Sequence, residues 1–130
     1  ALLTVNDFDK GAIGRIARDL VRLGFTIYAT RGTAAWLSQI GIPVETVNKV
    51  SEGSPHTVDL IASGKVGLVI STPLGSRAYV DGQALRSAAI RYGVMLVTTL
   101  TGAAATVQGI RALKQRELRV RSLQEHHAHR

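Results

Sequence analysis

A short turn rich in threonine and glycine is the segment of this 130-residue sequence with the clearest chemistry. Thr30-Arg31-Gly32-Thr33 directly follows an apolar run and opens a segment with helical periodicity. At such a place glycine lets the backbone approach a ligand, hydroxyls donate hydrogen bonds, and the free N–H groups of the first helical turn attract anions. The turn therefore predicts a phosphate cradle, with an ordinary helix cap as the alternative.

Polar side chains also follow the other apolar runs of the sequence. The carboxyl ends of parallel strands meet at one edge of a sheet, and ligands bind in the crevice outside that edge. We therefore expect these side chains to converge, so that two lysines and several hydroxyls surround an anionic ligand. The converging residues are Lys10, Thr30, Gly32, Thr33, Asn48, Lys49, Ser71, Thr72 and Thr98.

An alternating series of strands and helices is needed to position these residues. Five apolar runs predict short strands at residues 2–5, 25–30, 43–47, 66–71 and 94–97. Helical periodicity predicts a helix between Asn6-Asp7 and Gly24, and further helices at 33–40, 56–62, 81–92 and 99–113. The series predicts an α/β fold of three layers, doubly wound and Rossmann-type, with a mainly parallel five-stranded sheet and helices on both faces.

The same patterns predict further details of this organisation. The most apolar run, residues 66–71, is expected at the centre of the sheet and buried on both faces. Residues 75–79 are expected to form a turn and loop, and residues 118–123 are a candidate edge strand. The domain itself is expected to span residues 1–121, with 122–130 as a basic C-terminal tail that contains histidines.

Composition excludes several classes of protein. The absence of cysteine excludes disulfides, a thiolate nucleophile and a Cys-ligated zinc site, and no apolar run approaches the ~20 residues that span a bilayer. The net charge of +7 is concentrated near the end, where residues 111–130 hold six basic and two acidic residues. Aromatic residues make up only 5% of the chain, so small anions are expected as partners rather than nucleic acid.

Catalytic patterns are weaker than the binding pattern. The carboxylates show no paired general acid/base spacing, and neither a P-loop nor a nucleophile elbow occurs. His56 is a candidate base, although a histidine beside Pro55 at a helix start also suits a structural cap. His126, His127 and His129 are expected to be exposed on the tail rather than to hold a metal. The residues therefore indicate binding more than catalysis.

The sequence resembles the methylglyoxal-synthase-like (MGS-like) fold, and within it the C-terminal regulatory domain of the carbamoyl phosphate synthase large chain. The resemblance rests on Ala29-Thr30-Arg31-Gly32-Thr33 and, above all, on Asn48-Lys49-Val50-x-Glu52-Gly53-x-Pro55-His56. It implies an allosteric domain without catalysis of its own, which binds nucleotide effectors such as UMP or IMP and, in some members, ornithine.

The resemblance also implies roles for single residues. The effector phosphate site of the family is matched by Lys10, Thr30, Thr33 and Lys49, and Gly32 is assigned to the same site. Ser71 and Pro73 match nucleoside contacts, where Pro73 offers no donor, and Thr98 matches an ornithine contact whose tyrosine neighbour is Leu96 here. Asn48 and Thr72 are assigned to the same nucleoside or second site.

The implied longer protein is a cytoplasmic ligase that makes carbamoyl phosphate for pyrimidine and arginine biosynthesis. Its ATP and its Mg²⁺ or Mn²⁺ ions would bind outside these residues, so no cofactor is expected in this domain. The expected partners are a nucleoside monophosphate, the catalytic domains of the same large chain and the glutaminase small subunit, with no nucleic acid and no membrane. Two alternatives stay open: a methylglyoxal-synthase-type lyase, whose catalytic aspartate position is Ser54 here, and a degenerate domain kept for assembly.

Overall fold

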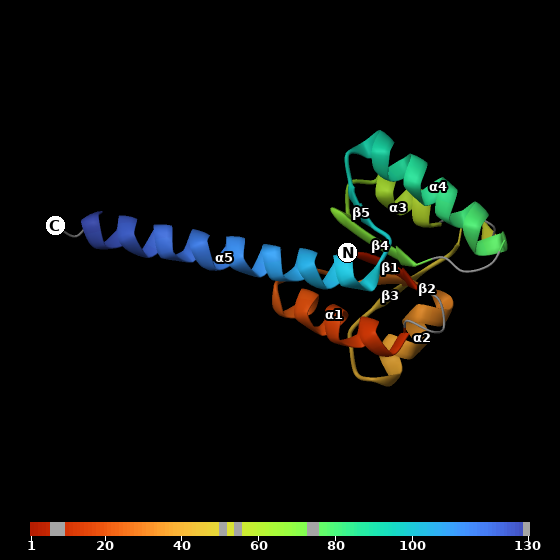
Figure 1. Cartoon of the computed structure of the whole chain (residues 1–130), viewed down its shortest axis with the longest axis horizontal. Coiled ribbons are helices and arrows are strands. Elements are labelled where there is room, and N and C mark those ends of the chain that lie inside the picture. Colours follow the sequence, from red (N-terminus) through yellow and green to blue (C-terminus); the bar gives the residue numbers. More distant parts are fainter. Residues whose placement is uncertain (6–9, 50–51, 54–55, 73–75, 129–130) are drawn as a thin grey trace.

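Five parallel strands lie between two layers of helices in the computed structural model, which describes residues 1–5, 10–49, 52–53, 56–72 and 76–128 (Figure 1). The strands are β1 (Leu2–Val5), β2 (Tyr28–Thr30), β3 (Glu45–Val47), β4 (Leu68–Thr72) and β5 (Met95–Val97). The helices are α1 (Lys10–Arg22), α2 (Arg31–Gln39), α3 (Thr57–Ala62), α4 (Ser76–Tyr92) and α5 (Leu100–Ala128). The sheet order is β3-β2-β1-β4-β5 and every neighbouring pair is parallel, which confirms the predicted doubly wound α/β architecture.

The two faces of the sheet carry separate hydrophobic cores. Leu3 and Ile70 pack under α1, α2 and α5, whereas their neighbours Leu2 and Val69 pack under α3 and α4. Successive side chains of a strand point to opposite faces, so a strand covered on both sides must be apolar at every position. This geometry explains why β1 and β4 read as continuous apolar runs rather than as alternating ones.

The predicted central position of residues 66–71 is wrong by one strand. All five residues of β4 are buried as expected, but β1 occupies the middle of the sheet and β4 lies between β1 and β5. A continuous apolar run indicates that helices cover both faces of a strand. Every interior strand of a doubly wound sheet meets that condition, so the run cannot specify which interior strand is central.

Two helices are longer than the sequence pattern predicts. Residues 76–79, expected as a loop, form the first turn of α4, because Arg77 and Ala78 are good helix formers and no breaker follows Gly75 in this turn. The candidate edge strand at 118–123 is helical, because α5 continues to Ala128 through residues without a glycine or proline stop after Gly109. Residues 122–128 of the predicted tail therefore continue this helix, while the boundary at residue 121 stays a prediction.

Glycines end the first two helices as the sequence predicts. Gly24 follows α1 with φ +95° and Gly41 follows α2 with φ +85°, a left-handed backbone that glycine adopts without a steric penalty. The amide of Phe25 then donates to the Leu20 carbonyl at 3.0 Å, and the amide of Ile42 donates to the Leu37 carbonyl at 2.9 Å. Both turns satisfy free carbonyls of the helix and direct the chain back to the sheet.

Candidate phosphate-binding site

The carboxyl ends of the strands form one edge of the sheet, where the predicted site residues gather. Strand register pairs Val5 with Thr72 and Thr30 with Val47, so the ends of β1, β4, β2 and β3 lie at neighbouring levels. Lys10 begins α1 at this edge, and Thr98 follows β5. Of Lys10, the structure describes the backbone position only. The topology thus brings all nine predicted residues to the same edge of the molecule.

The first turn of α2 has no side-chain cap from the described residues. Its N-cap residue, Thr30, is extended with φ −67° and ψ 160°, is buried, and makes no capping hydrogen bond through its hydroxyl. A helix start leaves its first backbone N–H groups without intrahelical acceptors, and the helix dipole makes them attractive to anions. The amides of Arg31, Gly32 and Thr33 are therefore arranged as a phosphate-binding group needs them.

Two other helices of the same molecule begin differently. His56 caps α3, accepting the Asp59 amide at 3.3 Å, and Thr99 caps α5, with its hydroxyl accepting the Gly102 amide at 3.0 Å. In both cases a side chain occupies the position that an anion would take. Among the helix starts whose preceding residues the structure describes, the start of α2 is thus distinguished by a threonine that leaves the first turn open.

Thr33 has a structural role that the sequence does not reveal. Its side chain is 2% exposed, and its hydroxyl accepts the Val5 amide at 3.3 Å and lies 3.5 Å from the Val5 carbonyl, to which it donates. The hydroxyl therefore ties the first turn of α2 to the end of β1. This arrangement leaves the backbone N–H of Thr33, rather than its hydroxyl, as the group that can meet a phosphate.

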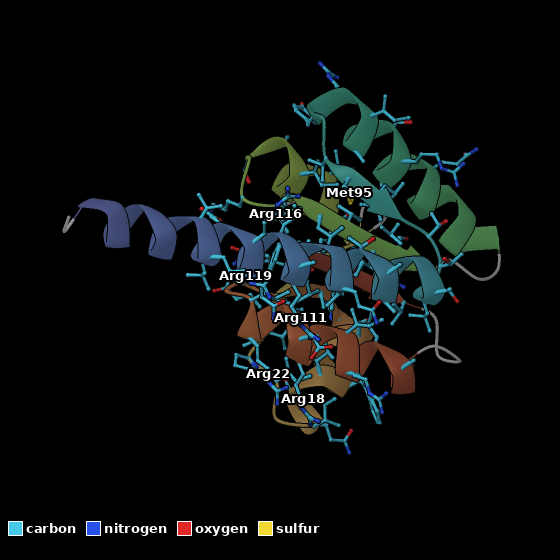
Figure 2. All side chains as sticks on the ribbon, turned by 60° about the vertical axis from the view of Figure 1, so that its left-hand side comes forward. Arg18, Arg22, Met95, Arg111, Arg116 and Arg119 are labelled. Carbon is cyan, nitrogen blue, oxygen red and sulfur yellow. The ribbon has the colours of Figure 1, made fainter. Side chains whose placement is uncertain are left out.

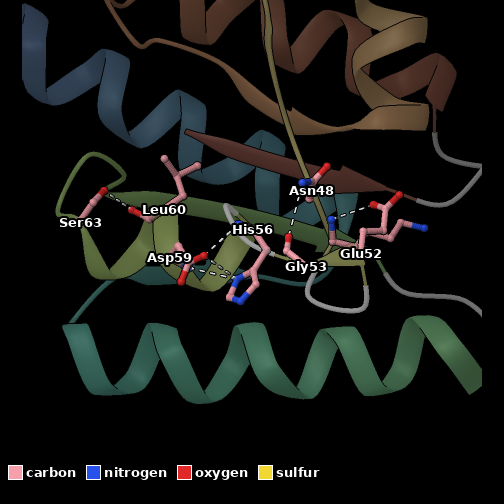
Figure 3. A network of polar contacts seen from close by, with 8 residues as sticks. Asn48, Glu52, Gly53, His56, Asp59, Leu60 and Ser63 are labelled. Atoms are coloured by element: carbon pink, nitrogen blue, oxygen red, sulfur yellow. Dashed lines mark hydrogen bonds and ion pairs between the residues drawn. The ribbon is translucent and has the colours of Figure 1, made fainter.

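The loop after β3 is held beside the start of α2 by the Glu52 carboxylate. One carboxylate oxygen accepts the Lys49 amide at 2.8 Å (Figure 3). The other carboxylate oxygen lies 3.8 Å from the Arg31 guanidinium. The Asn48 side-chain amide donates to the Gly53 carbonyl at 3.4 Å and so closes the same loop. These contacts place the exposed Lys49 near the open turn of α2 and engage the Asn48 side chain in loop structure.

His56 acts as the structural cap that the sequence offers as one of two alternatives. Its Nδ1 accepts the Asp59 amide, while its own amide donates to the Asp59 carboxylate at 3.0 Å, which completes a capping box (Figure 3). The same Nδ1 lies 3.5 Å from an Asp59 carboxylate oxygen. The ring thus positions α3, and no described contact turns it toward the open start of α2.

The other predicted ligand contacts lie at the ends of β4 and β5. Ser71 and Thr72 are 5% and 6% exposed, and Ser71 is paired with Thr4 of β1. Thr98 is exposed beyond β5. Ser54 and Pro73, which bear on the lyase reading and on nucleoside contacts, lie outside the described residues.

Sequence reasoning missed an arginine-lined groove on the outer side of α1. The groove has a volume of about 820 Å³ and lies between α1, α2 and α5. The signal was present in the sequence, because arginines three and four residues apart share one face of a helix. The charged side chains that line it are Arg15, Arg18, Asp19, Arg22 and Arg111.

Metal ligands and membrane-spanning helices would each indicate a further class of function. Within the described residues no group of three or more histidine and carboxylate side chains lies close enough to hold a metal ion. Among the helices that the structure describes, none is both long enough and apolar enough to cross a membrane.

Comparison with known proteins places this geometry in a family. The MGS-like domain model matches residues 12–98, more than half of the chain. The carbamoyl phosphate synthase large chain of Gemmatimonas aurantiaca is 49% identical over 124 residues, which are 95% of this chain and 11% of that protein. The "carbamoyl phosphate synthase large chain, C-terminal section" of Methanopyrus kandleri is 47% identical over 128 residues, which are 98% of this chain and 24% of that protein. The chain therefore spans between about a tenth and a quarter of the length of these relatives.

Solved structures show the same fold at low sequence identity. Methylglyoxal synthase from Elizabethkingia anophelis superposes with a TM-score of 0.66 at 16% identity, covering 82% of this chain and 74% of that one. A protein called ForH superposes with a TM-score of 0.62 at 19% identity, covering 96% and 92% of the two chains. With the family model and the large-chain relatives, these findings show that the chain belongs to the MGS-like domain family and is similar to the MGS-like part of carbamoyl phosphate synthase large chains.

Proposed function

We propose that this chain is the allosteric effector-binding domain of a carbamoyl phosphate synthase large chain, and that it binds the phosphate of a nucleoside monophosphate. The observation that carries the proposal is the open first turn of α2, next to which Glu52 holds the loop of Lys49. Anion-binding amides and a lysine at the carboxyl edge of a parallel sheet are the combination that phosphate recognition uses.

In this proposal the phosphate contacts are divided between backbone and side chains. The amides of Arg31, Gly32 and Thr33 donate to phosphate oxygens, and the Lys49 ammonium supplies a charge-assisted hydrogen bond. The hydroxyl of Thr30, which is not used for capping, donates a further bond, and Lys10 at the start of α1 adds charge. The nucleoside then extends along the strand ends toward Ser71, Thr72 and Thr98, with Asn48 at the loop.

The proposed consequence of binding is regulation rather than chemistry. Nucleotide binding biases the longer chain between two states, and a tenfold change in its substrate affinity requires only ~1.4 kcal/mol of coupling. The catalytic domains of that chain, the glutaminase subunit, ATP and Mg²⁺ or Mn²⁺ all act outside these residues. The proposed setting is the cytoplasm, in the supply of carbamoyl phosphate for pyrimidine and arginine synthesis.

Calorimetric titration of the 130-residue chain tests this function. UMP, IMP, inorganic phosphate and ornithine are titrated into the parent chain and into the variants Thr30→Val and Lys49→Ala. We expect a nucleotide to bind with one site per chain and each variant to weaken binding about tenfold, the effect of one charge-assisted hydrogen bond. Lys65→Ala is the matched control, because Lys65 is an exposed lysine that precedes β4 at the opposite edge of the sheet.

Two outcomes would replace the proposal. Absence of binding at millimolar nucleotide would contradict an effector role and leave an assembly role. Formation of methylglyoxal from dihydroxyacetone phosphate, lost in a His56→Asn variant, would instead establish a lyase. The solved methylglyoxal synthase shares the fold with this chain at 16% identity, which carries no argument for shared catalysis.

A further inference from the structure

The second half of α5 extends beyond the body of the molecule. Its first half packs on the sheet through the buried Ala103 and Val107. Its last described contacts with the body pair Arg111 with Asp19 at 3.3 Å and join the Lys114 ammonium to the Leu23 carbonyl. Every residue from 111 to 120 is exposed, and Figure 1 shows the helix continuing away from the sheet.

This segment carries apolar side chains that nothing described in the chain covers. Leu113, Leu118 and Val120 are 66%, 63% and 48% exposed. A helix of this length without tertiary packing is marginal in water, because most helical stability in proteins comes from a buried face. Leu113 and Val120 are seven residues apart and therefore share one face of the helix, and exposed apolar side chains that share a face are typical of a surface that another protein segment covers.

The direction of α5 indicates where the covering segment comes from. α1 runs from the carboxyl edge of the sheet to the amino edge, and Arg111 and Lys114 contact its last two turns and the residue that follows it. α5 therefore leaves the body at the amino edge, where β1 also begins (Figure 1). In the longer relatives, of which this chain spans 11% and 24%, any polypeptide preceding β1 enters at this same edge.

The charge of the surface indicates the chemistry of its partner. Arg111, Lys114, Arg116 and Arg119 accompany a single acidic residue, Glu117, between positions 111 and 120. Arg18 and Arg22 of α1 line one groove with Arg111 of α5, and Figure 2 shows Arg119 further along α5, so that the arginines form a strip from α1 onto α5. The Arg22 and Arg111 guanidinium groups both meet Asp19, at 4.0 Å and 3.3 Å, which leaves the strip with excess positive charge.

We infer that residues 111–120 of α5, together with Arg18 and Arg22, dock on an acidic and partly apolar face of the polypeptide that precedes this domain in a synthase large chain. The inference rests on the proposed function only in placing the chain within a longer one, and it requires no nucleotide. This docking surface is then the contact through which effector binding in this domain changes the rest of the large chain.

The inference is tested by amide hydrogen exchange in two proteins. One is a synthase large chain that contains this domain, called the long chain, and the other is the isolated 130-residue chain. We expect amides between 111 and 120 to exchange at least tenfold more slowly in the long chain, because docking excludes water and stabilises the helix. Amides around Ile90, an apolar residue that is 78% exposed on α4, are expected to exchange equally in both. Equal exchange at 111–120 in the two chains would overturn the inference.

Charge reversal separates the proposed acidic partner from other occupants. In the long chain, Arg116→Glu with Arg119→Glu should restore the exchange rates of the isolated chain, whereas Lys65→Glu should not. Slow exchange that resists both the reversal and high salt would overturn the acidic chemistry. Amide exchange at 111–120 that slows in the isolated chain as its concentration rises would instead identify a second copy of this chain as the partner and overturn the proposed one.

The same variants keep this test independent of the proposed function. The double reversal should leave nucleotide affinity of the isolated chain unchanged within twofold, because α5 beyond residue 110 is remote from the carboxyl edge. Absence of nucleotide binding by the 130-residue chain, with slow exchange at 111–120 in the long chain, would contradict the phosphate site and leave the docking surface valid.

Discussion

At the scale of single residues, the residue that precedes a helix has two different roles in this chain. His56, Thr99 and Thr30 all precede helices, and the first two use their side chains to cap them. Thr30 leaves its helix uncapped although threonine is a good capping residue. The sequence pattern around Thr30 allowed both a cap and a phosphate cradle, and the geometry of the side chain removes the first alternative.

Loss of the His56 cap is a test of its structural role. His56→Ala should lower the free energy of unfolding by about 1 kcal/mol, because the Asp59 amide loses its acceptor, the His56 Nδ1, whereas the backbone N–H of residue 56 keeps the Asp59 carboxylate. His56→Asn, which can accept the same amide, should recover most of that loss. Urea titrations with unchanged slope measure both effects. A His56→Ala variant as stable as the parent would contradict the capping role.

At the scale of secondary-structure elements, glycines fix where helices end but not how far α5 runs. The sequence pattern predicted that Gly24 and Gly41 end helices, and both do, because these positions have a left-handed backbone that glycine adopts readily. It failed at residues 118–123, where Leu118, Val120 and Leu123 resemble a short strand while their neighbours are helix formers. Local periodicity cannot settle such a segment, since no core packing selects between the two patterns.

Two glycine substitutions should change stability in opposite directions. Gly109 lies in α5 with open space around its α-carbon, so Gly109→Ala should stabilise the chain by about 0.5–1 kcal/mol through helix propensity. Gly41 has φ +85°, so Gly41→Ala should destabilise it by about 1–2 kcal/mol through the left-handed backbone. Calorimetric unfolding of both variants measures the difference. A stabilising Gly41→Ala would contradict the described turn.

At the scale of the whole molecule, the order and direction of the strands bring together residues that no local sequence pattern connects. The sequence predicted five parallel strands and a common carboxyl edge, because alternating strands and helices leave few ways to wind a sheet. It did not predict that the Thr33 hydroxyl binds β1, or that Asp19 of α1 forms an ion pair with Arg111 of α5, which is far from it in sequence. Those contacts depend on helix placement, which the sequence pattern leaves open.

The amino terminus provides a prediction for the fold as a whole. Burial lowers the pKa of the Ala1 amino group from 8.0 to about 6. The unfolded chain therefore binds more protons between pH 6 and 8, so stability should rise with pH across this window. Two pKa units correspond to at most ~2.7 kcal/mol, and because the amino group is only partly buried we expect about 1 kcal/mol.

A chain extended before Ala1 is the control for this pH dependence. Its Ala1 nitrogen is a peptide amide, which still donates to the Thr26 carbonyl, at 2.7 Å in the chain described here, but does not titrate. The difference in unfolding free energy between the two chains should therefore fall as pH rises from 6 to 8. An equal pH dependence in both chains would show that other groups cause it.

Amide NMR during a titration with UMP, followed by inorganic phosphate, tests the central claim most directly. The account predicts that the amides of Arg31, Gly32 and Thr33 shift in a saturable way with both ligands, since their N–H groups receive the phosphate. With inorganic phosphate, the amides of Gly102 and Ala103, at the capped start of α5, should stay in place. Unshifted amides at 31–33 with either ligand, or equal shifts at both helix starts with inorganic phosphate, would contradict a phosphate site at the open turn of α2.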